Sequence, residues 1–344
     1  RLDAAGAVLV AKLSLGALAM GDVWFGGKTR NPWDPKEGSS GSSAGPAAAV
    51  AAGLVGFAVG TETLGSIVSP STRCGCTGLR PTFGRVSRYG AMALAWSMDK
   101  IGPICRDIDD CAAVFNAIYG PDGRDGTVVK APFDWNPNLD IRTLRIGYTK
   151  SLFDKAPDKG EEEWHAFDLA TVETLRKLGL NLVPIELPDR PVDAMSLLLT
   201  CEAAAAFDDL TRSGRVDELT DQGPDAWPNI FRQGELIPAV EYIQANRARV
   251  LAMEDMRKLF SDIDLYVAPT FGGHNLTLTN LTGHPAVVVP NGFRKNGTPT
   301  SITFTGDLFR EGKALAVARA YQEATDFNLR QPPLMAVEGS SRAG

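Results

Sequence analysis

The sequence predicts an α/β fold in which helices pack on a β-sheet. Short apolar runs typical of buried strands alternate along the chain with longer segments of helical periodicity, as at residues 144–148, 161–178 and 180–185. Such alternation is typical of a sheet covered by helices. Apolar residues make up 44% of the 344 residues and charged residues 22%, which is the composition of a globular protein and excludes the disordered and collagen-like classes.

The expected elements follow one another along the whole chain. A helix is expected from Pro46, because Pro suits a first helical turn, the serines before it can cap the helix and the alanines after it are strong helix formers. Residues 120–142 contain three prolines and are expected to form an irregular connection. The expected strands are residues 7–11, 54–59, 144–148, 180–185, 264–268 and 285–289, and the expected helices are residues 46–52, 105–119, 161–178, 192–211, 237–260 and 313–325.

Charge and cysteine content argue against several kinds of partner and site. The chain has 35 Lys and Arg against 41 Asp and Glu, and a net charge of −6 argues against a nucleic-acid backbone or an anionic membrane as the main partner. No apolar run approaches the roughly 18 residues of a membrane-spanning helix. Five cysteines in a long chain favour free thiols in a reducing compartment, and hence a cytoplasmic location. A metal site is not expected, because Cys74 and Cys76 are too close together for a zinc knuckle and only three histidines are present.

Several local motifs have simpler explanations than the activities they suggest. Residues 26–29 resemble the end of a phosphate loop, but Asp22 stands where that loop needs glycine, so a surface turn is expected. Residues 41–45 match the G-x-S-x-G elbow of α/β-hydrolases, and His274 or His284 follows in the right chain order to act as a base. The Pro-containing stretch before them is not the strand that this elbow requires, however, and His284 is expected to fix a loop. Three Asn-x-Thr sequons are weak signals without a visible signal peptide; they begin at Asn275, Asn280 and Asn296.

The first residues have the character of the middle of a structural unit. The chain starts at Arg1 without a methionine, and residues 7–11 have the pattern of a buried strand entered from an earlier helix. We therefore expect further sequence before Arg1 in the protein, together with any signal peptide.

Residues 41–81 carry the most specific signal in the chain. They contain Gly-Ser-Ser-Ala-Gly, an Ala-rich helix, Gly-Thr-Glu-Thr-Leu-Gly-Ser-Ile and Cys-Gly-Cys-Thr-Gly-Leu-Arg-Pro. This run resembles the amidase signature family, which has Gly-Ser-Ser-Gly-Gly-Ser-Ala, then Gly-Thr-Asp-Thr-Gly-Gly-Ser-Ile and then Cys-Gly-x-x-Gly-Leu-Lys-Pro-Thr. The match has no gap, and it extends more loosely through residues 99–103, 264–270 and 280–286.

The resemblance implies the amidase-signature fold, a large twisted mixed β-sheet flanked by helices on both faces. We expect residues 1–344 to form a single domain of this kind that lacks its N-terminal part. Its signature core would comprise about residues 1–119, the connection residues 120–142 and the remainder residues 143–344.

The resemblance also implies a Ser–cis-Ser–Lys hydrolase. By motif position Ser66 is the nucleophile, and Ser42, in a cis peptide bond after Gly41, is the bridging serine that relays a proton to a lysine. The neighbouring pair Ser39 and Ser40 would need an insertion to take that role. A serine hydroxyl becomes a good nucleophile only when an adjacent base takes its proton, and no histidine lies near these loops in the sequence.

The oxyanion hole is expected from backbone N–H groups of the turn that ends at the nucleophile. Preorganised donors of this kind contribute on the order of 3–4 kcal/mol each to transition-state stabilisation. Leu64 departs from the family, which has glycine there, and its side chain is expected to narrow the acyl pocket. No metal or organic cofactor is implied. The donors are Thr63, Leu64, Gly65 and Ser66.

The catalytic lysine of the family belongs to a Gly-Val-Pro-x-x-x-Lys-Asp string that lies upstream of this chain. Lys12 and Lys28 are the only lysines near the serine loops, and Lys12 matches a structural position of the family. The lysine is therefore expected outside these residues, and the 344 residues alone are expected to be inactive, because losing the base of such a triad removes most of its catalytic power.

The expected function is hydrolysis of a small-molecule carboxylic amide to carboxylate and ammonia or amine, through an acyl-enzyme on Ser66. Two alternatives are open. One is the amidase-like subunit of a glutamyl- or aspartyl-tRNA amidotransferase, which generates ammonia from glutamine for a partner. The other is a non-catalytic relative that keeps the fold for binding. The identity of the amide and the presence of a homo-oligomer are also open, whereas direct contact with nucleic acid or a membrane is not expected.

Overall fold

An eight-stranded mixed sheet forms the centre of the protein. The structure is a computed structural model and describes residues 1–333. The strand order is β5-β7-β6-β11-β12-β10-β8-β9, in which β8 runs parallel to β9 and β10 and the other neighbours are antiparallel. These strands are β5 (Phe57–Glu62), β6 (Thr77–Arg80), β7 (Lys100–Cys105), β8 (Ile146–Thr149), β9 (Leu182–Ile185), β10 (Leu265–Pro269), β11 (Ala286–Phe293) and β12 (Pro299–Gly306).

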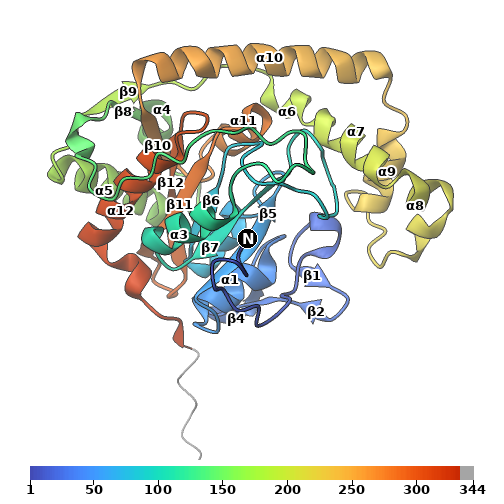
Figure 1. Cartoon of the computed structure of the whole chain (residues 1–344), viewed down its shortest axis with the longest axis horizontal. Coiled ribbons are helices and arrows are strands. Elements are labelled where there is room, and N and C mark those ends of the chain that lie inside the picture. The colour runs from blue at the N-terminus through green and yellow to red at the C-terminus, as the bar shows by residue number, and fades with distance from the viewer. Residues whose placement is uncertain (334–344) are drawn as a thin grey trace, which may run out of the picture.

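Helices cover both faces of this sheet, which confirms the predicted α/β fold. One face is packed by α3 (Ile108–Ile118), α5 (Glu162–Lys177) and α12 (Glu311–Thr325). The other face is packed by α1 (Ala44–Ala51), α2 (Val68–Cys74) and α11 (Asn275–Thr282), and α10 (Ala239–Asp262) lies outside α11 and crosses the top of the molecule in Figure 1. The remaining helices are α4 (Lys150–Asp154), α6 (Val192–Met195), α7 (Leu197–Ala206), α8 (Asp208–Arg212) and α9 (Trp227–Gly234).

The two hydrophobic layers follow from the alternation of side chains along a strand. In β10, Leu265 and Val267 belong to the layer under α3, α5 and α12, whereas Tyr266 and Ala268 belong to the layer under α10 and α11. Because all four side chains are buried, this strand has apolar residues at every position, as is typical of strands covered on both faces.

Two small hairpins lie beside the sheet near α1 (Figure 1). The first consists of β1 (Val23–Trp24) and β2 (Gly27–Lys28), and the second of β3 (Arg30–Asn31) and β4 (Asp34–Gly38). The chain leaves β4 directly into the serine loop before α1, so these hairpins set the path on which that loop enters the site.

The predicted strand at residues 7–11 is wrong. This segment is coil, and the side chains of Val8, Leu9 and Val10 are 81%, 85% and 69% exposed. A strand needs a neighbour to accept and donate its backbone hydrogen bonds, and within residues 1–333 no strand pairs with this one. An apolar pattern alone is therefore not sufficient to predict a strand here.

Other differences concern element boundaries and strands that were not predicted. The predicted strand 54–59 lies three residues further on, as β5, because a turn with Gly53 at φ +70° separates it from α1. The predicted helix 105–119 starts only at Ile108, where the Asp107 carboxylate accepts the N–H of Asp110 and caps it, while Cys105 ends β7. The predicted helix 192–211 is three short helices, and β6, β7 and β12 were not predicted. Residues 121–140 contain no helix or strand.

Candidate active site

The serine loop before α1 is held by the segment that precedes the first hairpin. The Gly41–Ser42 peptide bond is cis, at the position that the family resemblance implies. The Gly16 N–H donates to the Ser42 carbonyl at 3.0 Å, and the Ser40 N–H donates to the Asp22 carboxylate at 3.0 Å. A Cβ atom at Gly41 would lie 1.7 Å from the Gly21 carbonyl oxygen. This close approach explains why glycine precedes Ser42.

The second serine loop joins the end of β5 to the start of α2. Gly65 has φ +88°, a conformation that favours glycine, and it turns the chain so that Ser66 stands at the base of α2. One Glu62 carboxylate oxygen accepts the N–H groups of Ile67 and Val68 at 2.8 and 2.9 Å. The last residue of β5 therefore fixes the first turn after the nucleophile.

The two serine loops lie against each other. The Ser43 N–H donates to the Ser66 carbonyl at 3.2 Å. The Ser43 hydroxyl also bonds both backbone groups of Thr61 in β5, each at 3.0 Å. Ser42 and Ser66 are 2% and 7% exposed. The fold thus brings both predicted serines into one buried region, although they are 24 residues apart in the sequence.

The turn between β5 and α2 keeps its backbone donors free. Within residues 1–333, none of the N–H groups of Thr63, Leu64, Gly65 and Ser66 donates a hydrogen bond to another group. Unpaired N–H groups in a buried turn are uncommon, because a buried donor without a partner destabilises the fold. Four free donors in succession that end at a serine could together bind a negatively charged oxygen.

A buried ion pair between Glu62 and Arg80 stabilises the start of this turn, and it was not predicted from the sequence. Arg80 of β6 donates to the other Glu62 carboxylate oxygen at 3.0 Å, and both side chains are fully buried. The Asn280 amide of α11 donates to the same oxygen at 2.9 Å. Burial raises the pKa of Glu62, but Arg80, Lys100 and the Val68 N–H outweigh it, and the net shift is downward. Glu62 is therefore an ionised acceptor. The uninterrupted burial of β6 is a tertiary property that one sequence does not reveal.

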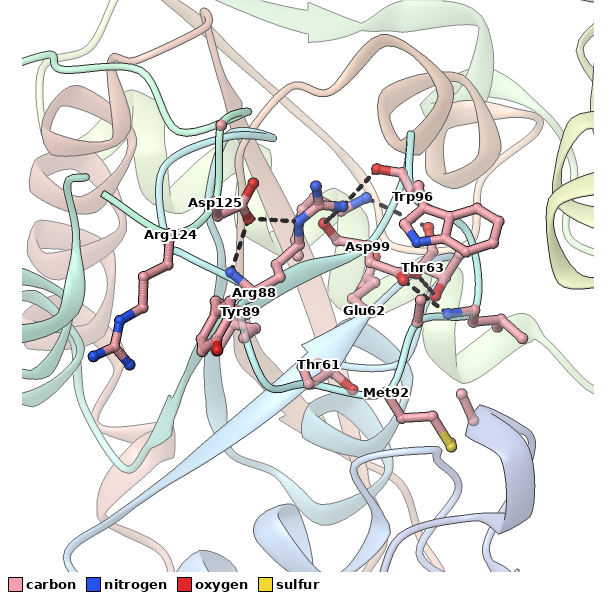
Figure 2. Close-up of a pocket in the computed structure, with 17 residues that line it drawn as sticks. Thr61, Glu62, Thr63, Arg88, Tyr89, Met92, Trp96, Asp99, Arg124 and Asp125 are labelled. Carbon is pink, nitrogen blue, oxygen red and sulfur yellow. Dashed lines mark hydrogen bonds and ion pairs between the residues drawn. The ribbon is translucent and has the colours of Figure 1, made fainter. Parts of the chain in front are cut away.

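Asp99 and Lys100 were also missed as site residues. They line a cavity of about 380 Å³ together with Thr61 and Glu62 of β5 and with Thr63 of the turn that leads to Ser66. Figure 2 shows Thr63, Asp99 and Trp96 at one end of this cavity and Arg124 at the other. Arg88 lies between them, where it pairs with Asp125 at 3.3 Å and donates to the Trp96 carbonyl at 2.5 Å. The Thr63 hydroxyl donates to the Asp99 carboxylate at 2.6 Å, which ties the start of the turn to the start of β7.

The lysines near the serine loops do not complete a triad. Lys12 and Lys28 are exposed, and neither donates a hydrogen bond to Ser42 or Ser66. Within residues 1–333 no lysine side chain donates a hydrogen bond to either serine.

The other candidate motifs are structural. Burial, and then Arg80, lowers the pKa of His284 to about 3; its ring stacks on Phe260 and its Nδ1 bonds the Thr282 hydroxyl at 2.8 Å, so it holds a loop. The hydroxyl of Ser43, the serine of the G-x-S-x-G match, is hydrogen-bonded to the backbone of Thr61 in β5. Residues 26–29 form part of a hairpin and not a loop that leads into a helix.

The sequons, the cysteines and the helix lengths are the remaining sequence features. The sequon residues Asn275 and Asn280 are buried, whereas Asn296 is exposed. All five cysteines are free thiols, and residues 1–333 contain no cluster of three metal-ligating side chains. None of the helices described in these residues is long and apolar enough to cross a membrane.

Comparison with known proteins establishes the class of the protein. The fold is that of enzymes that act on amide C–N bonds. A sequence model of the family Amidase matches residues 1–278, and the chain therefore belongs to the amidase family, which confirms the resemblance seen in residues 41–81.

Relatives of two kinds are similar to this chain. A glutamyl-tRNA(Gln) amidotransferase subunit of Roseiflexus castenholzii is 37% identical over 96% of this chain and 76% of its own length, and that of Methylococcus capsulatus is 34% identical over 96% and 77%. The structure of the peptide amidase from Stenotrophomonas maltophilia is 29% identical, with a TM-score of 0.81 over 96% of this chain and 76% of its own. The structure of the corresponding amidotransferase subunit from Thermotoga maritima is 26% identical, with a TM-score of 0.78 over 94% and 75%.

Proposed function

We propose that the protein cleaves a carboxylic amide through an acyl-enzyme on Ser66. The observation that carries the proposal is the row of four free N–H groups that ends at this buried serine. The Ser66 hydroxyl attacks the amide carbonyl carbon, and the developing oxyanion accepts hydrogen bonds from residues 63–66. The C–N bond then breaks, the amine or ammonia leaves with a proton, and water hydrolyses the ester to release the carboxylate and restore Ser66.

Ser42 is the proton relay in this scheme. Its loop touches the nucleophile loop through the bond between Ser43 and Ser66, and its own side chain is buried. It passes the proton of Ser66 to a lysine, which the family resemblance places in sequence upstream of Arg1. The chemistry uses no metal or organic cofactor, because serine, relay and lysine supply the nucleophile and the base.

A second candidate is the glutamine-cleaving subunit of a tRNA-dependent amidotransferase. The named relatives at 34–37% identity are amidotransferase subunits, and these favour the second candidate over a stand-alone amidase. Both candidates use the same acyl-enzyme chemistry at Ser66. They differ in the substrate, which is glutamine in one and another amide in the other, and in the need for partner subunits.

The chemistry is tested by substitution at the two serines. The protein, expressed with any sequence that precedes Arg1 in its gene, is assayed against glutamine and a panel of aliphatic and aromatic amides. We expect Ser66→Ala to abolish turnover and Ser42→Ala to leave a small fraction of it. Ser71→Ala is the matched control, because Ser71 is a buried serine of α2, the helix that follows Ser66, and its hydroxyl has no partner in residues 1–333. Full activity of Ser66→Ala would overturn the proposal.

The substrate panel separates the two candidates. Turnover of glutamine that rises on addition of partner subunits supports the amidotransferase reading. Turnover of other amides by the purified protein alone, with glutamine inert, supports the stand-alone amidase.

A further inference from the structure

Lys100 is a buried lysine directly behind the nucleophile turn that the proposed chemistry does not use. It begins β7 and pairs with Glu62 of β5, so it lies beside the strand end that leads to Ser66. Its side chain is almost fully buried. Its Nζ donates hydrogen bonds to the carbonyl oxygens of Thr63, at 3.4 Å, and of Met98.

Thr63 connects the Lys100 ammonium group to the turn that ends at Ser66. The carbonyl of Thr63 and the N–H of Leu64 belong to one planar peptide unit and point in opposite directions. Any group that fixes the carbonyl therefore also fixes the N–H. The Thr63 side chain is held as well, because its hydroxyl donates to Asp99, whose carboxylate accepts the N–H groups of Leu94 and Ala95.

We propose that Lys100 is a positioning residue whose ammonium group holds the Thr63 carbonyl, and that it thereby orients and polarises the Leu64 N–H of the oxyanion hole. This inference rests on the proposed function of Ser66. A cation beside a carbonyl oxygen draws electron density through the peptide and makes its N–H a stronger donor, and the effect is large where burial keeps the local dielectric low.

The charges that surround Lys100 come from four elements. Glu62 at the end of β5 and Asp99 before β7 are negative, whereas Arg80 of β6 and Arg249 of α10 are positive. Burial and Arg80 lower the pKa of Lys100 to about 7, against the opposing effect of Glu62 and Asp99. The ammonium form is therefore complete well below pH 7 and is lost as the pH rises through that value. The contribution of Lys100 to catalysis should follow the same course.

The test compares Lys100→Met and Lys100→Arg with the unmodified protein between pH 6 and pH 9. Methionine has a similar shape without the charge, and arginine restores a charge. We expect Lys100→Met to lower kcat roughly 10- to 100-fold at pH 6, somewhat less than the loss of an oxyanion donor itself, with KM unchanged. The ratio of the kcat of the unmodified protein to that of Lys100→Met should decrease as the pH rises above 7. Lys100→Arg should recover part of the lost kcat at every pH.

The control is Lys313→Met, because Lys313 is a partly buried lysine that pairs with Asp264 at the start of β10, away from the turn. It should leave kcat unchanged. Two results would overturn the role of Lys100 without affecting the proposed function of Ser66. One is a ratio of unmodified to Lys100→Met kcat that does not vary with pH. The other is a folded Lys100→Met protein with unchanged kcat, while Ser66→Ala is inactive. Turnover that survives in Ser66→Ala would overturn this inference and the proposed function together.

Discussion

At the scale of single residues, Glu62 organises the site more than either serine does. Its carboxylate accepts four hydrogen bonds, from the N–H groups of Ile67 and Val68 at the start of α2, and from the side chains of Arg80 and Asn280. A buried carboxylate is stable only when its charge is matched and its oxygens are satisfied. The Glu62 side chain thereby joins β5, α2, β6 and α11 next to the turn that carries Ser66.

Glu62→Gln should lower the free energy of unfolding by about 3–5 kcal/mol, because it leaves the buried Arg80 without its counter-charge. Urea denaturation followed by circular dichroism measures the change. Glu37→Gln removes the charge from an exposed pair with Arg73 and serves as control, with an expected effect within about 0.5 kcal/mol. Equal stabilities of the two variants would refute this account of Glu62.

The sequence predicted some of these residues and not others, for a physical reason. Ser42, Ser66 and the N–H groups between Thr63 and Ser66 belong to short contiguous motifs, so a local pattern could indicate them. Lys100 and Asp99 act only because β7 pairs with β5, and Arg80 only because β6 is buried on both faces. Such roles depend on pairing between distant segments, which no local pattern contains.

At the scale of elements, α5 is attached to the sheet by a polar chain within an otherwise apolar layer. Asp168 of α5 accepts the Asn291 amide of β11 at 2.9 Å, and the Asn291 oxygen accepts the Thr300 hydroxyl of β12 at 2.7 Å. Burial raises the pKa of Asp168 to about 7, although the bond from Asn291 opposes the shift. The helix is thus joined to two strands through a carboxyl group that is protonated in the folded state below neutral pH.

This carboxyl group should make stability fall as the pH rises. Between about pH 4 and pH 7 the folded state holds a proton that the unfolded state has lost, so the free energy of unfolding decreases across that window by on the order of 2–4 kcal/mol. Asp168→Asn keeps the shape and removes the titration, so its stability should exceed that of the unmodified protein at pH 8. Urea midpoints at pH 4, 6 and 8 measure this. Glu173→Gln, on the exposed side of the same helix, should leave the pH dependence unchanged.

The predictability of elements also varied with length. The long helices α5, α10 and α12 lie within two residues of the predicted ranges, because their periodicity extends over several turns. The strands β6 and β7 were missed because glycines and prolines within and beside them interrupt the apolar pattern. The segment 7–11 shows the opposite error, since its apolar pattern fits a strand that has no partner in residues 1–333.

At the scale of the whole molecule, the two halves of the chain share one sheet. β5, β7 and β6 come from the first third, and β6 pairs directly with β11, so that Ala286 lies opposite Arg80. The hydrophobic layer under α3, α5 and α12 likewise contains Leu79 and Val287 together. A small apolar cluster around α1 and β5 comes from the first half alone, but the main layer is built from both halves.

We therefore propose that the chain is a single domain and expect one cooperative unfolding transition. Differential scanning calorimetry should give one peak whose calorimetric and van't Hoff enthalpies agree. Two resolved peaks, or limited proteolysis that releases a stable fragment ending within residues 120–142, would contradict the single domain.

The pairing of β6 with β11 also affects how the protein is made. A ribosome adds about 5–20 residues per second, so the edge of β6 is completed roughly 10–40 s before its partner β11 has been synthesised. During this interval Gly78, Leu79 and Arg80, the three β6 residues that pair with β11, lack their partner strand, and such an open edge is a template for pairing with another chain. The yield of active protein should therefore depend on chaperones and on growth temperature more than the stability of the finished fold would suggest. Slower synthesis of residues 81–285 should lengthen the exposure and increase the fraction that aggregates.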